Sequence, residues 1–154
     1  MGGLLPVADV ARKGFLSART ILSVSPSDNI KGHPYLLIKI ANLAFFSSGT
    51  LFLNIRRAGS LDTLIITLNT DGSGSELLSC DVAVLGGNTV PNISSVKYML
   101  LDNSEVWLEV KIKTYSYINN AYAFSLAQQI YDMKYSDTPI EGATTTIEGN
   151  IRKL

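Results

Sequence analysis

The side chains that could do chemistry in this sequence are few. His33 is the only histidine, and it lies between Gly32 and Pro34 in a predicted loop. A serine hydrolase needs a nucleophile held against such a base, but the sequence has no Gly-x-Ser-x-Gly nucleophile elbow. Cys80 is the only cysteine, so an internal disulfide and a multi-thiolate metal site are excluded. We therefore expect a loop histidine, a small buried cysteine, no metal and no catalytic residue.

Paired carboxylates and glycine-rich loops give no stronger signal. Glu105 and Glu109 share one face of a predicted strand, but their α-carbons would lie ~13 Å apart, too far for the usual glycosidase pair. We expect them in a polar row that faces solvent or another subunit. The segment Asp71–Ser75 lacks the Gly-Lys-Ser/Thr ending of a phosphate loop and is predicted to be a hairpin turn. Asn92-Ile93-Ser94 matches a glycosylation acceptor, but the amino terminus does not resemble an export signal.

Aromatic side chains are the candidates for subunit contact or recognition, because tyrosine and tryptophan are enriched at interfaces and can stack on sugars. Trp107 stands out, since its neighbours are charged and it lies opposite the apolar face of its strand. Its indole could be buried against another sheet of the same subunit or at a subunit contact, or it could bind a sugar. The full candidate set is Tyr35, Phe52, Tyr98, Trp107, Tyr115 and Tyr117.

The elements that must position these residues are strands. In Glu105–Lys113, Val106, Leu108, Val110 and Ile112 alternate with polar or aromatic residues, so one face is apolar. Asp102-Asn103-Ser104 precedes this strand and predicts a hairpin with Val96–Leu101. Gly-, Ser-, Asn- or Asp-rich turns bound the other predicted strands: Tyr35–Ala41, Thr50–Arg56, Asp62–Leu68, Leu77–Leu85 and Ala121–Gln128. Many short strands without a helical period predict an all-β sandwich of the jelly-roll type.

Length and composition limit the partners. The 154 residues suit one domain, with an arm or connector at 1–30, a head at 31–154 and an irregular tail from 136 onward. The 13 basic and 13 acidic side chains cancel, so no field attracts nucleic acid, and no apolar run approaches the ~20 residues of a membrane span. With 46% hydrophobic and 17% charged residues, we expect apolar surface to be buried between subunits.

Several segments resemble the C-terminal domains of bacteriophage tail fibres and tail spikes. The junction Leu5–Ala8 and Lys13–Ala18 is similar to the short motif that precedes such distal domains, with Phe15-Leu16 in place of the more usual Leu-Met. The segments Tyr35–Ala41, Gly49–Arg56, Glu105–Lys111 and Tyr115–Phe124 follow the order seen there, and the resemblance covers about two thirds of the chain. It implies a jelly roll similar to tumour-necrosis-factor and complement C1q heads, forming a homotrimer in the virion tail.

The resemblance leaves more than one role open. A fibre tip would cap or stabilise the shaft of its parent fibre or spike and touch host surface glycan. A tail-spike chaperone of the preneck-appendage type would instead guide trimer assembly and then be released by one self-cleavage per chain. ATP as a cofactor is implied by this resemblance only, and the residues themselves indicate no cofactor. Ser27 and Asp28 are the only candidates for such a processing region, and an ordinary turn is the alternative for them. A carbohydrate-binding module is the third hypothesis.

Overall fold

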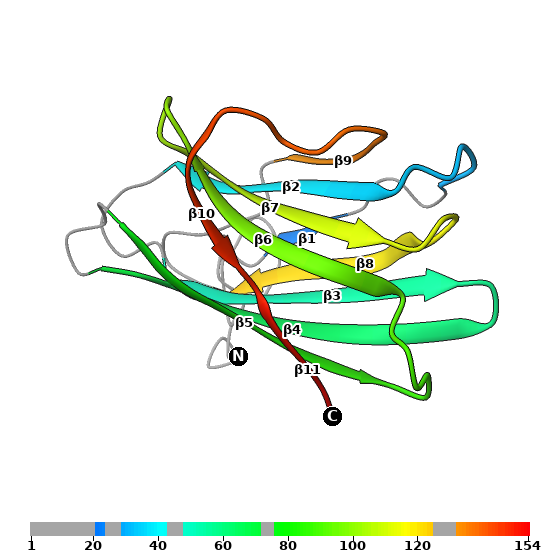
Figure 1. Ribbon diagram of the computed structural model, residues 1–154. Coiled ribbons are helices and arrows are strands. Elements are labelled where there is room, and N and C mark those ends of the chain that lie inside the picture. Colours follow the sequence, from blue (N-terminus) through cyan, green and yellow to red (C-terminus); the bar gives the residue numbers. More distant parts are fainter. Residues whose placement is uncertain (1–20, 24–28, 43–47, 72–75, 125–131) are drawn as a thin grey trace, which may run out of the picture.

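The chain folds as two β-sheets packed face to face, which confirms the predicted all-β sandwich (Figure 1). This computed structural model describes residues 21–23, 29–42, 48–71, 76–124 and 132–154. Within them every regular element is a strand, and there is no helix long and apolar enough to cross a membrane. The predicted arm therefore falls almost entirely outside the described residues, as do Ser27 and Asp28.

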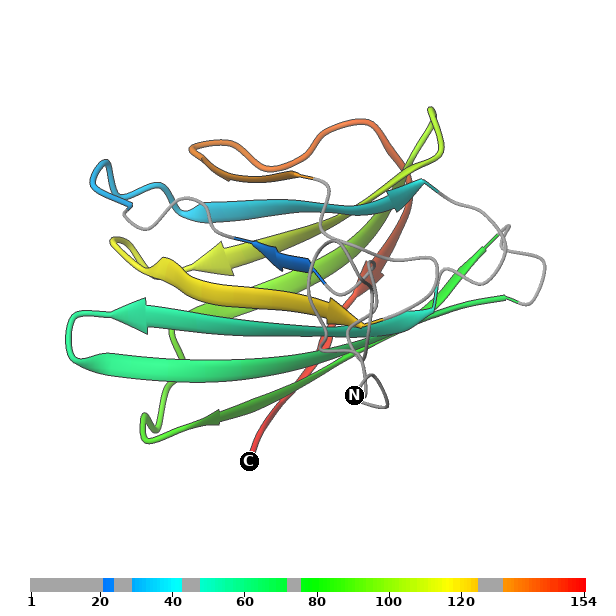
Figure 2. The same cartoon turned by 180° about the vertical axis from the view of Figure 1, so that it is seen from behind.

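Sheet A has six strands and sheet B has five, and Figure 2 shows the same two layers from behind. In spatial order, sheet A contains β1 (Ile21–Ser23), β8 (Tyr117–Phe124), β3 (Gly49–Arg57), β4 (Ser60–Thr70), β5 (Leu77–Gly86) and β11 (Asn150–Lys153). Sheet B contains β10 (Ala143–Glu148), β6 (Ile93–Leu101), β7 (Glu105–Ile112), β2 (Tyr35–Asn42) and β9 (Asp132–Ser136). Every pairing is antiparallel except that of β11 with β5.

The alternation in the sequence builds the core. Along β4, for example, Leu64, Ile66 and Leu68 are fully buried, while the residues between them point outward and are more exposed. Successive side chains of a strand leave opposite faces of the sheet, so each strand contributes every second residue to the interior. The largest contributions come from completely buried residues of both sheets: Leu36, Ile38, Leu53, Ile55, Leu64, Ile66, Val82, Val84, Val96, Tyr98, Leu108 and Val110.

The strands predicted in the middle of the chain are confirmed to within a few residues, and so is the hairpin at Asp102–Ser104 between β6 and β7. The prediction for Ala121–Gln128 was displaced, because β8 begins at Tyr117 and the residues after Phe124 are outside the described part. The order β8-β3-β4-β5 is that of a Greek key, in which three hairpin-linked strands are joined by a fourth beside the first.

The expectation of an irregular tail from residue 136 was wrong. After the connection 137–142, β10 pairs with β6 in sheet B and β11 pairs with β5 in sheet A. We call residues 143–153 the strap, because this one segment joins the edges of both sheets (Figure 1). Gly149 makes the transition: its amide donates to the Val96 carbonyl at 2.7 Å, and a Cβ at this position would lie 2.8 Å from that oxygen. Thr144, Thr145 and Thr146, which suggested a tail, are instead residues of the edge strand β10, and Gly142 and Gly149 flank that strand.

Candidate functional site

The outer face of sheet A carries a row of apolar side chains that crosses four neighbouring strands. Phe52 in β3 lies opposite Tyr122 in β8 and Ile65 in β4, and Ile65 lies opposite Ala83 in β5. Directly opposed side chains on one face of a sheet are close enough to pack together. All four are only partly buried. We call these four residues the apolar row.

A polar row runs beside the apolar row and is held by its own hydrogen bonds. Asn54 accepts a hydrogen bond at Oδ1 from the Thr63 hydroxyl at 2.6 Å, and its Nδ2 donates to Asn120 Oδ1. The two rows together form a shallow hollow of about 280 Å³, lined by Phe52, Asn54, Thr63 and Tyr122. Its lining is therefore uncharged, with two aromatic rings on one side and an amide and a hydroxyl on the other.

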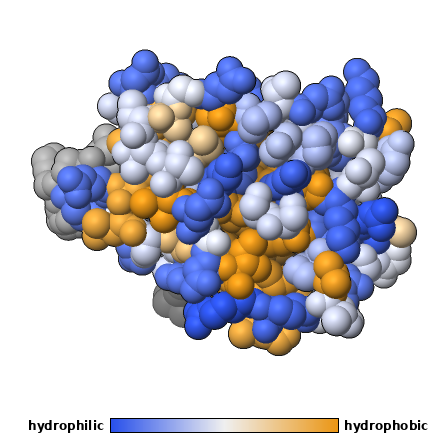
Figure 3. Space-filling view, viewed as in Figure 1, coloured by the Kyte–Doolittle hydropathy of each residue, from blue (hydrophilic) through white to orange (hydrophobic). Residues whose placement is uncertain are grey.

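Exposed leucines extend this apolar surface toward the β5 edge. Leu61 and Leu85 also lie on sheet A and are 39% and 40% exposed, and Leu78 at the start of β5 is 54% exposed. Figure 3, which views the molecule from the strap side, shows apolar surface gathered over β5 and β11. Large contiguous patches of exposed apolar surface are rare on monomers and mark interaction sites.

Of the aromatic candidates, only Phe52 belongs to the apolar row. Tyr117 lies on the same sheet at the start of β8, opposite Arg56, and is partly buried. Tyr35 is partly buried at the start of β2 in sheet B, and Tyr115 is 59% exposed in the turn before β8. The six candidates therefore do not form one site.

The prediction for Tyr98 was wrong. It was a candidate for subunit contact or recognition, but it is fully buried in the core. The reason is its position in β6, where it shares the inward face with Val96 rather than the outward face. A tyrosine flanked by apolar residues on its own face, two positions from a valine, is more consistent with the core than with the surface.

Trp107 lies on the outer face of sheet B and is covered by its own chain. Only 9% of the residue is exposed. The Lys134 ammonium lies 5.3 Å from the centre of the indole ring, and Trp107 Nε1 donates to Glu105 Oε2 at 3.1 Å. Ile140, from the connection between β9 and β10, lines a hollow of about 240 Å³ beside the ring. The indole is thus covered within its own subunit, but by Lys134 and the β9–β10 connection and not by a second sheet as predicted.

The carboxylates next to Trp107 differ in their surroundings. Glu109 is only 2% exposed and accepts a hydrogen bond from the Ile140 amide at 2.8 Å, so it does not belong to a solvated or subunit-facing row. Glu105 is partly exposed and lies 3.5 Å from Lys39 Nζ. The hydrogen bond from Trp107 and, to a lesser extent, the charge of Lys39 hold the pKa of Glu105 below its ordinary value. The connection 137–142 is what buries one carboxylate and leaves the other at the rim.

The remaining groups that could do chemistry, His33 and Cys80, lie in surroundings that indicate structural roles. His33 Nδ1 lies 2.6 Å from Asp137 Oδ1, which links the loop before β2 to the β9–β10 connection. Burial raises the pKa of the Cys80 thiol to about 12, with a further contribution from Asp81, so it stays protonated at neutral pH. Among the residues that the structure describes, no three His, Cys, Asp or Glu side chains gather as a possible metal site.

The asparagine of the possible glycosylation triplet Asn92-Ile93-Ser94 is buried in the folded chain. Asn92 is 3% exposed, and its side-chain Nδ2 donates to Ser60 Oγ at 3.0 Å. Its backbone amide donates to Asp62 Oδ2 at 2.7 Å, and Asp62 is fully buried. The side-chain nitrogen of Asn92, which lies in the β5–β6 connection, is thus buried and already hydrogen-bonded.

The sequence contained part of the signal for the apolar row. Phe52 and Ile65 each alternate with buried residues in predicted strands, so their outward direction could be read from the period of two. What could not be read was the register, because it is the pairing of β3 with both β4 and β8 that brings Ile65 and Tyr122 beside Phe52. Comparisons with protein-family models, curated proteins and solved structures found no match.

Proposed function

We propose that this domain is an assembly head, which forms a homotrimer through the outer face of sheet A and caps or stabilises a bacteriophage tail fibre or tail spike. The observation that carries the assembly role is the apolar row of Tyr122, Phe52, Ile65 and Ala83, only partly buried in the single chain. Burying such a row between subunits removes apolar surface from water, which stabilises by roughly 25 cal/mol per Å².

Charge supports a second copy of the same chain as the occupant of this face. The chain carries no net charge, so copies of it do not repel one another over long range. The hollow beside the row is lined by neutral side chains only. This neutral, hydrogen-bonded hollow can pack on an equally neutral surface without leaving a charge buried and unpaired, while Arg56 and Asp81 lie farther along the same face.

The viral part of the proposal rests on the resemblance of the sequence segments to fibre and spike domains. Under it, the domain acts in the virion tail, its partners are two further copies and the parent shaft, and contact with host surface glycan belongs to the same role. The jelly-roll description also belongs to the proposal. A jelly roll is built from two Greek keys, and the order β8-β3-β4-β5 supplies one.

Light scattering across a dilution series tests the assembly role directly. We expect three times the mass of one chain at all but the lowest concentrations. Ile65→Glu places a charge in the middle of the row and should give a monomer, whereas Thr146→Glu, at an exposed position of β10, should leave the trimer intact. A native chain that is monomeric throughout the series would overturn the proposal, and so would a trimer that Ile65→Glu leaves unchanged.

A further inference from the structure

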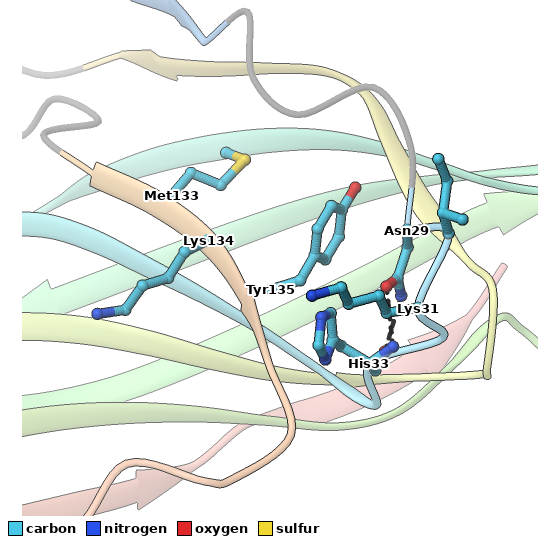
Figure 4. Close-up of a pocket in the computed structure, with 7 residues that line it drawn as sticks. Asn29, Lys31, His33, Met133, Lys134 and Tyr135 are labelled. Carbon is cyan, nitrogen blue, oxygen red and sulfur yellow. Dashed lines mark hydrogen bonds between the residues drawn. The ribbon is translucent and has the colours of Figure 1, made fainter.

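A second surface, remote in sequence from the apolar row, forms a pocket of about 390 Å³. It lies between the loop that precedes β2 and the edge strand β9, segments about 100 residues apart in the chain (Figure 4). Pockets of roughly 300–1,000 Å³ are typical of small-molecule sites. We call it the loop pocket; its lining residues are Asn29, Ile30, Lys31, His33, Met133, Lys134 and Tyr135.

The loop wall of the pocket is held in place by hydrogen bonds. Asn29 is 4% exposed; its Nδ2 donates to the carbonyls of His33 at 2.7 Å and Ser116 at 3.1 Å, and its Oδ1 accepts from the His33 amide at 2.8 Å. Gly32 closes the turn with φ of 71° and packs against Thr114. Because the backbone at Lys31 and His33 is already fixed, a ligand would not have to order it, which lowers the entropic cost of binding.

The opposite wall offers a flat, partly apolar surface. Tyr135 is partly buried, and its hydroxyl oxygen accepts a hydrogen bond from the Ile118 amide at 2.8 Å, which fixes the ring. Figure 4 shows this ring between Met133 and the Asn29 loop. Ile30 is 80% exposed at the rim, where its aliphatic side chain is open to contact. A ligand that presents an apolar ring face would cover these groups.

Among the described residues that line the pocket, Lys31 is the cation that has neither an ion-pair nor a ring partner. Lys134 directs its ammonium to Trp107 in β7, and Asp137 is paired with His33 Nδ1. Lys31 is exposed and makes no ion pair with any residue in the described part of the chain. Lys31 and His33 both line the pocket, and both are labelled in Figure 4. The bond to Asp137 orients that ring, so its second nitrogen is held in a fixed direction.

We propose that the loop pocket binds a small ligand that combines a carboxylate with an apolar-faced ring, as an acidic monosaccharide does. The carboxylate would pair with Lys31, a ring hydroxyl would donate to the second nitrogen of His33, and the ring would stack on Tyr135 and contact Ile30. This binding does not depend on the oligomeric state, because none of these residues belongs to the apolar row.

Glucuronic acid and glucose form a matched pair of probes, since they differ only in the carboxylate at C6. Titration of the isotope-labelled full chain, followed by the NMR shifts of backbone amides, should show saturable changes at residues 30–33 and 133–135 with glucuronic acid and none with glucose. Lys31→Gln should weaken binding about tenfold, the effect typical of losing a charge-assisted contact. Lys153→Gln, which removes the same charge from β11, should leave the affinity unchanged.

Four results would overturn the proposal. The first is an absence of saturable shifts with glucuronic acid at millimolar concentration, and the second is equal binding of glucose. The third is binding that Lys31→Gln does not weaken, and the fourth is a set of shifts that lie away from the loop pocket. Because Lys31 is exposed and its side chain has no partner among the described residues, the substitution should not disturb folding.

Discussion

The two outer faces of the sandwich start from similar sequence patterns and end in different surroundings. On sheet B, Trp107 and Glu109 point away from the core but are 9% and 2% exposed, because the Lys134 side chain of β9 and the connection 137–142 lie over them. On sheet A, Phe52 and Ile65 point away from the core and remain partly exposed. The outer face of sheet B is thus covered by the chain itself, whereas the outer face of sheet A has partly exposed apolar side chains.

The comparison shows that a period of two in the sequence predicts which way a side chain points, but does not predict what lies over that side chain. Alternation shows which residues leave the inner face of a strand. Whether those residues meet water, a subunit or another segment depends on where distant parts of the chain run. Four measurements sharpen or break the contrast between the covered face of sheet B and the partly exposed face of sheet A.

The largest effect is expected from Trp107→Ala on the covered face. Removing a buried indole leaves a cavity beside Lys134 and Ile140, and we expect the free energy of unfolding to fall by ~3–5 kcal/mol. Urea denaturation measures this, with Val90→Ala as the control, because Val90 is 63% exposed and should change stability by less than about 0.5 kcal/mol. A loss below about 1 kcal/mol for Trp107→Ala would mean that the face is not packed.

A smaller loss is expected where Glu109 holds the connection in place. Glu109→Ala leaves the Ile140 amide without its acceptor and should cost ~1–3 kcal/mol. Glu109→Gln keeps an oxygen acceptor and should recover much of this stability. Hydrogen exchange at the Ile140 amide reports the local effect. Equal protection in the native chain and in Glu109→Ala would show that the bond does not hold the connection.

On sheet A, breaking the polar row should cost less, because water can replace its hydrogen bonds. Asn54→Ala removes the contacts to Thr63 and Asn120, and we expect a loss of about 1 kcal/mol in the free energy of unfolding at concentrations that keep the chain monomeric. Thr67→Ala, at an exposed position of the same sheet, serves as the control. A loss as large as that of Trp107→Ala would indicate that this face is as well packed as sheet B.

The smallest effect concerns the pH dependence at the rim of the covered face. The pKa of Glu105 lies below its ordinary value of 4.5 in the folded chain, so its carboxylate stabilises the fold above that pH. This contribution is lost as the pH falls through the lowered folded pKa. The melting temperature of the native chain should therefore exceed that of Glu105→Gln near neutral pH and approach it in acid. A difference that stays constant down to pH values well below 4.5 would contradict the assignment.

The fold class could be predicted because it follows from local rules, and part of the candidate site followed as well. The alternation in Glu105–Lys113 and the turn at Asp102–Ser104 fixed a strand and a hairpin without tertiary information. The strap escaped prediction because its Thr-rich strand pairs with residues far away in the sequence, and edge strands of this length have little apolar pattern of their own.

The site residues were harder for the same reason. Phe52 was a candidate from its type and spacing, but its neighbours Ile65 and Tyr122 are set by register. Trp107 appeared exposed because nothing in its own strand indicates that Lys134 and Ile140 cover it. The pairing of His33 with Asp137 joins residues 104 positions apart, and no short-range pattern predicts such a contact.

The strap has a consequence for how this domain is made. It lies C-terminal to both strands that it joins, so the outer edges of β5 and β6 have no partner in a nascent chain until residues 143–153 have left the ribosome. Unpaired strand edges are the surfaces through which β-proteins join one another incorrectly. The domain therefore passes through an interval during synthesis in which both sheets are open on the same side, and translation of one short segment ends that interval for the two sheets together.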